Sequence, residues 1–136
     1  MLPSSGLELL LDLRECQTDA LNNPGALEKI LSDAARAAGF EVVARVAHQF
    51  AHQGVTLILI LSQSHIALHT WPEERFAAVD VYACGERKTI ERGLEIVREN
   101  LVAQLGARSF THRLVERVRD EHAFILSHLD TNEKQD

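Results

Sequence analysis

Cysteine, aromatic residues and long apolar runs are all scarce in this chain of 136 residues. Its two cysteines, Cys16 and Cys84, are too few for a disulfide scaffold, and neither has the paired spacing of a zinc site. Aromatic residues make up only 5% of the chain, so leucine, valine, isoleucine and alanine must form most of the core. We therefore expect a protein stabilised by aliphatic packing, with no metal.

Basic residues and membrane-length segments are also lacking. Lys and Arg number 14 against 20 Asp and Glu, a balance that argues against a nucleic-acid-binding protein, which needs a basic surface to displace counterions. The longest apolar run, Val55 to Leu61, falls far short of the roughly 20 residues that cross a bilayer. Glu8 and Asp12 interrupt the N-terminal apolar residues, so we expect no signal peptide and no membrane contact. The expected location is the cytoplasm, where thiols stay reduced.

What the chain does contain is a globular composition, with 46% apolar and 25% charged residues. The length fits a single domain, which we place at residues 1–130, followed by a disordered tail at 131–136. Alternating or continuous apolar patterns predict strands at residues 7–13, 41–50, 55–61, 64–70, 76–84 and 107–119. The almost wholly apolar strand at 55–61 is typical of a central strand that is covered on both faces.

Helical spacing and end signals predict the helices. Asn23 can cap a helix that begins at Pro24, and Gly39 can end it. A second helix is predicted at residues 89–105 and a short third one at 120–129.

This order of elements predicts an α+β fold. Consecutive strands with short links favour antiparallel pairing. Two main helices cannot cover both faces of such a sheet, so we expect a two-layer sandwich with both helices on one face. The other face would then pair with a second copy and form a larger αββα dimer.

The segment 63–85 gathers most of the residues that could carry chemistry, but their spacing alone leaves the function open. His65 and His69 lie about 13 Å apart on an extended strand, too far for one metal ion to bind both rings. A serine between strands, such as Ser64, is ordinarily a turn residue. A thiol at a strand end, such as Cys84, is ordinarily a small buried side chain.

A longer match changes this interpretation. The run S-H-I-A-L-H-T-W-P-E at residues 64–73, followed by A-A-V-D-V-Y-A-C-G at 77–85, resembles the signature of prokaryotic, pyruvoyl-dependent S-adenosylmethionine decarboxylase proenzymes. D-L-R-E-C at 12–16 and H-Q-F-A-H-Q-G-V-T at 48–56 resemble further parts of that family, and the likeness spans roughly residues 7–105. It implies a cytoplasmic zymogen that cleaves itself and then serves spermidine biosynthesis.

The resemblance implies how the cofactor is made. The hydroxyl of Ser64 would attack the carbonyl of Gln63, and β-elimination would then leave a pyruvoyl group at residue 64. The products would be a β chain of residues 1–63 and an α chain of 64–136. The family's processing base falls on His69, and its second processing hydroxyl falls on Thr56, where serine is usual.

The resemblance also implies the roles in turnover. The pyruvoyl group derived from Ser64 would bind the substrate amine as a Schiff base and accept electrons from the lost carboxylate. The family's proton donor falls on Cys84. Its adenine-stacking aromatic residue falls on Phe50 and its ribose-binding carboxylate on Glu73, side chains suited to a purine face and a diol.

Several positions depart from the family pattern and keep two alternatives open. Gln63 stands where the family usually has Glu, Leu57 replaces a glycine and His52 a proline, and Glu8 stands where the family often has His. One alternative keeps the pyruvoyl chemistry but acts on ornithine or arginine; the presence of Phe50 and Glu73 favours the nucleoside substrate instead. The other is an unprocessed pseudoenzyme that acts as a binding partner.

Overall fold

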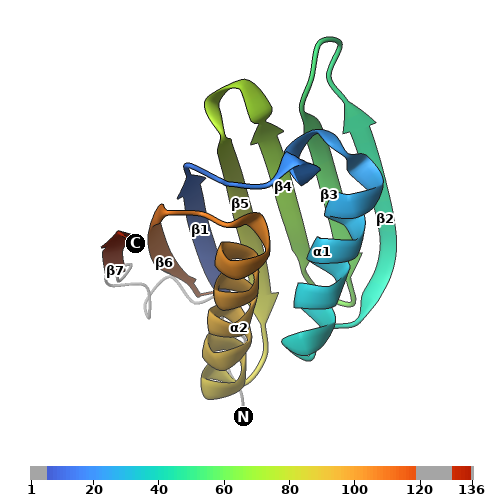
Figure 1. Cartoon of the computed structure of the whole chain (residues 1–136). Helices are drawn as coiled ribbons and strands as arrows, with labels where there is room; N and C mark the ends of the chain where they lie inside the picture. Colours follow the sequence, from blue (N-terminus) through green and yellow to red (C-terminus); the bar gives the residue numbers. More distant parts are fainter. Residues whose placement is uncertain (1–5, 119–129, 136) are drawn as a thin grey trace.

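In the computed structural model, helices α1 and α2 lie side by side on one face of an antiparallel sheet (Figure 1). The structure describes residues 6–118 and 130–135. Neighbouring strands follow the order β2-β3-β4-β5-β1-β6-β7, and every neighbouring pair is antiparallel. The predicted α+β fold, with both main helices on one face, is confirmed. In the described part of the chain, neither helix is long and apolar enough to cross a membrane.

The first six strands agree closely with the predicted ones, and a seventh was not predicted. They are β1 (Gly6–Arg14), β2 (Val42–Gln49), β3 (Val55–Leu61), β4 (His65–Trp71), β5 (Phe76–Cys84), β6 (Ser109–Arg117) and β7 (Asp130–Gln135).

The prediction was wrong at the C-terminal end. Instead of a disordered tail, residues 130–135 form β7, which pairs with β6, so β6 is not an edge strand. The physical reason is that an edge strand presents unpaired N–H and C=O groups, and a polar segment can pair with them through its backbone alone. The short helix predicted at 120–129 lies outside the described residues.

The helix ends follow their capping residues. α1 (Pro24–Ala37) begins where predicted, and the Asn23 side chain accepts a hydrogen bond from Ala26 N at 3.1 Å. α2 (Arg87–Leu105) begins two positions earlier than predicted because the Glu86 carboxylate caps it by accepting from Thr89 N at 2.9 Å.

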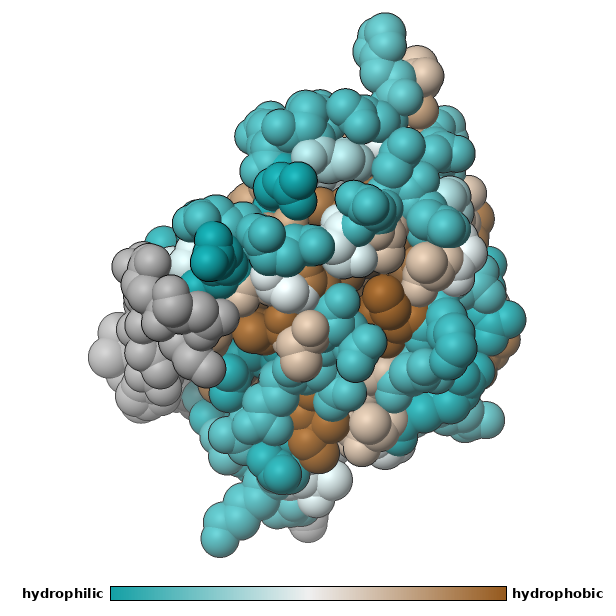
Figure 2. Space-filling model, in the orientation of Figure 1, coloured by the Kyte–Doolittle hydropathy of each residue, from teal (hydrophilic) through white to brown (hydrophobic). Residues whose placement is uncertain are grey.

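The core lies between the sheet and the helices. It is built mainly from alternate residues of the strands and from one face of each helix, and these include Leu7, Leu9, Leu11, Leu13, Leu27, Leu31, Leu57, Leu59, Leu94 and Leu101. The outer surface on this side is mainly hydrophilic, with hydrophobic residues showing between the helices (Figure 2).

The opposite side of the sheet, which we call the open face, is not covered within one protomer. It exposes large apolar side chains: Leu10 at 40%, Val46 at 59% and Ile60 at 49%. We predicted that β3 would be covered on both faces; in the protomer only its helix-facing residues are buried. The apolar residues on its second side therefore need another partner.

This asymmetry predicts how mutations in the sheet affect stability. Leu59 is fully buried, so Leu59→Ala should lower the free energy of unfolding by about 2–5 kcal/mol. Val43 lies on edge strand β2 and is 60% exposed, so Val43→Ala should cost less than about 1 kcal/mol. Urea denaturation of the two variants checks the difference, and equal losses would contradict the assignment of the core.

Both cysteines are free thiols, but their surroundings differ. Cys16 is fully buried in the core, whereas Cys84 is partly exposed. Burial raises the pKa of the Cys16 thiol to about 11, although the charge of Arg75 opposes part of this effect. The thiolate is the reactive form of cysteine, so this raised pKa and the burial both protect Cys16 from alkylation.

Alkylation should therefore distinguish the two thiols. We expect iodoacetamide at pH 8 to modify Cys84 in the native protein and to leave Cys16 intact, with both modified after denaturation. Peptide mass spectrometry locates the adducts. Rapid native labelling of Cys16 would show that it is not buried as described.

Candidate functional site

Ser64 lies in the tight turn that joins β3 to β4. The backbone N–H of Leu61 donates to the carbonyl of Ser64 at 2.9 Å and closes the turn. Ser62 and Gln63 project into solvent, and Ser64 is partly buried. The turn lines a cavity of about 280 Å³ together with residues 39–41 and Cys84.

Cys84 ends β5 beside this turn. Its thiol donates to the backbone carbonyl oxygen of Gln63 at 3.4 Å and also lies 3.7 Å from the side-chain Oε1 of the same residue. The strands thus bring together three of the predicted site residues, Gln63, Ser64 and Cys84, which we call the Ser64 cluster. The thiol points at the carbonyl whose carbon the Ser64 hydroxyl would attack.

Thr56 and His69 form a second group further along the same strands. They are cross-strand partners on β3 and β4, and the hydroxyl of Thr56 hydrogen-bonds to Nδ1 of His69 at 2.9 Å. Both side chains lie on the open face. A proton can therefore pass between the Thr56 hydroxyl and the His69 imidazole along this hydrogen bond.

The structure does not bring His69 to Ser64 within one protomer. β4 runs as a single extended strand from His65 to Trp71, so Ser64 and His69 are separated by about 16 Å. The bend that would be needed to join them is not present in β4. The proposed base and the proposed nucleophile therefore belong to different ends of the sheet.

Phe50 lies at the His69 end, in an aromatic group that the sequence patterns did not reveal. The Phe50 ring centroid is 6.3 Å from that of Trp71, which in turn is 6.2 Å from the imidazole of His69. Glu73 follows in the short turn Pro72–Glu74 and is exposed. We call Phe50, Thr56, His69 and Glu73 the His69 cluster.

A hydrogen-bond network holds the Phe50 turn in place. Phe50 N donates to Gly54 O at 2.8 Å, and Gly54 N donates to Oδ1 of Asn22 at 2.7 Å. Gly54 has a φ of +106°, and a Cβ there would lie 2.8 Å from the Phe50 ring and 2.5 Å from the carbonyl of Thr70, so only glycine fits. No spacing signal in the sequence linked Asn22 to Phe50.

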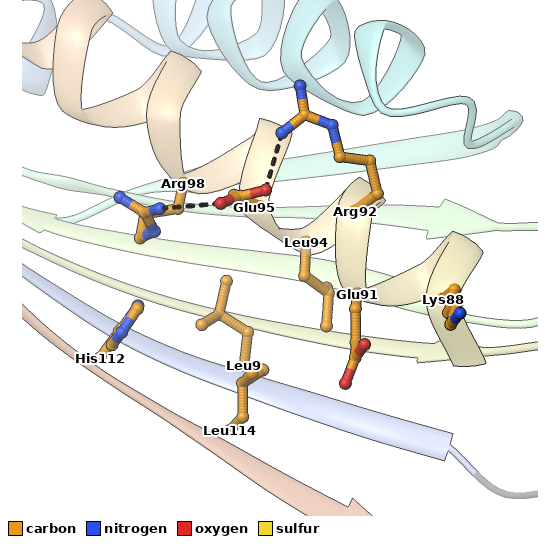
Figure 3. Close-up of a pocket in the computed structure, with 9 residues that line it drawn as sticks. All are labelled: Leu9, Lys88, Glu91, Arg92, Leu94, Glu95, Arg98, His112 and Leu114. Carbon is orange, nitrogen blue, oxygen red and sulfur yellow. Dashed lines mark hydrogen bonds and ion pairs between the residues drawn. The ribbon is translucent and has the colours of Figure 1, made fainter. Parts of the chain in front are cut away.

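Two larger cavities lie elsewhere among the described residues. One, of about 530 Å³, is on the open face and includes His69, Asp12, Asp80 and Arg113. The other, of about 520 Å³, lies between α2 and β6 on the helix side (Figure 3). Its floor is apolar, and Arg92 and Arg98 both pair with Glu95 at its rim, at 2.7 and 3.9 Å. None of the predicted site residues lines this second cavity.

Comparisons with known proteins agree with these observations. The family model for S-adenosylmethionine decarboxylase matches residues 7–117. The S-adenosylmethionine decarboxylase proenzyme of Methanococcus maripaludis is 45% identical over 84 residues, which cover 62% of this chain and 69% of the relative. The corresponding proenzyme of Parasynechococcus marenigrum is 37% identical over 116 residues, 85% of this chain and 91% of the relative.

The fold is shared with a solved member of the family. The crystal structure of the adenosylmethionine decarboxylase from Aquifex aeolicus superimposes with a TM-score of 0.74 at 28% identity, covering 88% of this chain and 95% of that one. The family model spans the described fold from β1 to β6 and includes both clusters. This chain belongs to the S-adenosylmethionine decarboxylase family.

Proposed function

We propose that this protein is a self-processing, pyruvoyl-dependent decarboxylase of S-adenosylmethionine that produces the aminopropyl donor for spermidine synthesis. The observation that carries the proposal is the 3.4 Å contact between the Cys84 thiol and the Gln63 carbonyl, next to Ser64 in its turn. The names of the matched relatives favour S-adenosylmethionine over ornithine or arginine. These names also give no support to the alternative that the protein is an unprocessed pseudoenzyme acting as a binding partner.

In the processing step, the hydroxyl oxygen of Ser64 attacks the carbonyl carbon of Gln63, and the amide becomes an ester as the nitrogen leaves. The Cys84 thiol already donates to this carbonyl oxygen and can stabilise the negative charge that develops there. Removal of the Cα proton of residue 64 then breaks the ester C–O bond and releases the carboxylate of Gln63. Hydrolysis of the resulting dehydroalanine gives the pyruvoyl ketone and ammonia. Gln63 does not prevent this step, because only its backbone carbonyl reacts.

In turnover, the pyruvoyl group supplies an electron sink for the electron pair left by the departing carboxylate. The residues of the Ser64 cluster suit such a group, because residue 64 is only partly buried and opens into a cavity of about 280 Å³. Cys84, which lies beside residue 64, would donate a proton to the substrate α carbon. Phe50 offers an apolar face to the adenine, and Glu73 offers two acceptor oxygens to the ribose.

We further propose that the working enzyme is a homodimer of cleaved protomers, paired through the open face. In a two-fold dimer each protomer presents the same surface, so the His69 end of one sheet can lie against the Ser64 end of the other. Exposed Leu10, Val46 and Ile60 give this face the apolar area that an interface needs. The 280 Å³ cavity beside Ser64 is at the small end for a nucleoside substrate, and a second copy would enlarge it.

This arrangement keeps both fragments in one domain after cleavage, because their strands belong to the same sheet. It also needs Cys84 as a free thiol, which fits a reducing cytoplasm.

The self-processing step is tested by the intact mass of the purified, denatured protein. We expect two pieces divided between residues 63 and 64, with a pyruvoyl mass on the larger one. Ser64→Ala should give one full-length, inactive chain, because the nucleophile is missing. Release of carbon dioxide from S-adenosylmethionine, but not from ornithine or arginine, identifies the substrate. An uncut wild-type chain after long incubation, or activity in Ser64→Ala, would refute the pyruvoyl mechanism.

The shared site is tested by mixing two defective chains. The His69→Ala chain expressed alone should remain uncut, because it lacks the processing base. Co-expressed with Ser64→Ala, the His69→Ala chain should be cleaved, because the Ser64→Ala partner still supplies His69. Mass spectrometry of the tagged chains measures this, and His52→Ala, in the exposed β2–β3 turn, serves as the control. Cleavage of the His69→Ala chain by itself would show that His69 is not the base. If the mixed chains stay uncut, His69 does not act across the interface.

A further inference from the structure

Three side chains of types that can ligate a metal ion lie close together on the open face, next to the Ser64 cluster. Glu8 comes from β1, His65 from β4 and Asp80 from β5, which are adjacent strands of the sheet. Glu8 and His65 are both cross-strand partners of Tyr82, and Asp80 lies two positions before it on the same strand. The alternation of each strand therefore points all three side chains to the same side.

Their distances suit one small cation. The ligand atoms of the three residues all lie within 4.8 Å of one another, and Nε2 of His65 is 3.0 Å from Oδ2 of Asp80. A tetrahedral metal such as Zn²⁺, with bonds of about 2.0–2.2 Å, holds its ligand atoms about 3.4 Å apart. The distance between His65 and Asp80 is close to this spacing. A rotation of the Glu8 side chain would complete the set.

A weak interaction now holds Glu8. Its carboxylate pairs with Arg117 at 3.3 Å, and the Arg117 side chain is 61% exposed. The Arg117 guanidinium also lies over the Tyr82 ring, at 5.1 Å from its centroid. An exposed ion pair of this kind contributes little to stability, so a metal ion can replace the guanidinium as the partner of Glu8.

We infer that Glu8, His65 and Asp80 form a binding site for a first-row divalent transition metal, such as Zn²⁺. One imidazole and two carboxylates favour such a cation over Mg²⁺, which prefers an all-oxygen site. His69 takes no part, because it lies further along β4 and is paired with Thr56.

The site also has a structural consequence, which rests on the proposed cleavage. Glu8 belongs to the fragment 1–63, whereas His65 and Asp80 belong to the fragment 64–136. A bound metal would therefore tie the two fragments together, one residue away from the new chain end. Metal binding itself does not depend on cleavage.

The test is a Zn²⁺ titration of the chelator-treated full chain, monitored by isothermal titration calorimetry. We use both the wild type and Ser64→Ala, so that the site is assayed whether or not the chain is cut. We expect one Zn²⁺ per protomer in each. His65→Gln and Asp80→Asn should weaken binding at least tenfold. The matched controls His52→Gln and Asp12→Asn, one in an exposed turn and one elsewhere on the open face, should bind as the wild type does.

Two further readouts make the result decisive. Co²⁺ in place of Zn²⁺ should show no thiolate charge-transfer band, since Cys84 is not a ligand. Zn²⁺ should raise the unfolding temperature of the cleaved wild type but not that of Asp80→Asn, whose fold is checked by circular dichroism without metal. Unchanged affinity in both ligand variants, or a thiolate band, would overturn the site. An uncut wild-type chain that still binds Zn²⁺ would instead refute only the proposed function.

Discussion

The covering of only one face of the sheet is the constraint on which the rest of the molecule depends. α1 and α2 bury the leucine-rich side of the strands, and within one protomer the other side stays open. Exposed apolar residues such as Ile60, which is 49% exposed on β3, are typical of a surface that binds a partner. Every candidate catalytic side chain lies on this open face or at its edges, so the surface that needs a partner is also the surface that carries the chemistry.

That constraint explains why the candidate site is divided. Strand alternation fixes which side a residue faces, and the rise of about 3.3 Å per residue fixes how far apart two residues lie. Ser64 and His69 cannot meet along one extended strand. In the proposed dimer, Ser64 of one protomer would lie near His69 of the other. A second copy would cover the apolar residues and also unite the nucleophile with its base. One interface would thus serve both stability and catalysis.

Much of this could be predicted from the sequence, because it depends on local patterns. Asn23 and Pro24 set the start of α1, and alternation located β1 and β5 almost to the residue. Features that depend on contacts between distant segments could not be predicted. The hydrogen bond between Asn22 and Gly54 joins a residue before α1 to a residue after β2. The group of Glu8, His65 and Asp80 takes one residue from each of three strands. β7 was missed because backbone pairing needs no apolar pattern.

Cleavage between residues 63 and 64 would leave the sheet intact for a reason visible in its strand order. The first fragment contains β1, β2 and β3, and the second contains β4, β5 and β6. In the sheet, β1 lies between β5 and β6, so a strand of the first fragment is enclosed by strands of the second. The fragments also meet where β3 pairs with β4. They can separate only by breaking three antiparallel ladders and exposing Leu9 and Leu11 of the core. The proposed cut would therefore open one turn and free residue 64 without releasing either fragment.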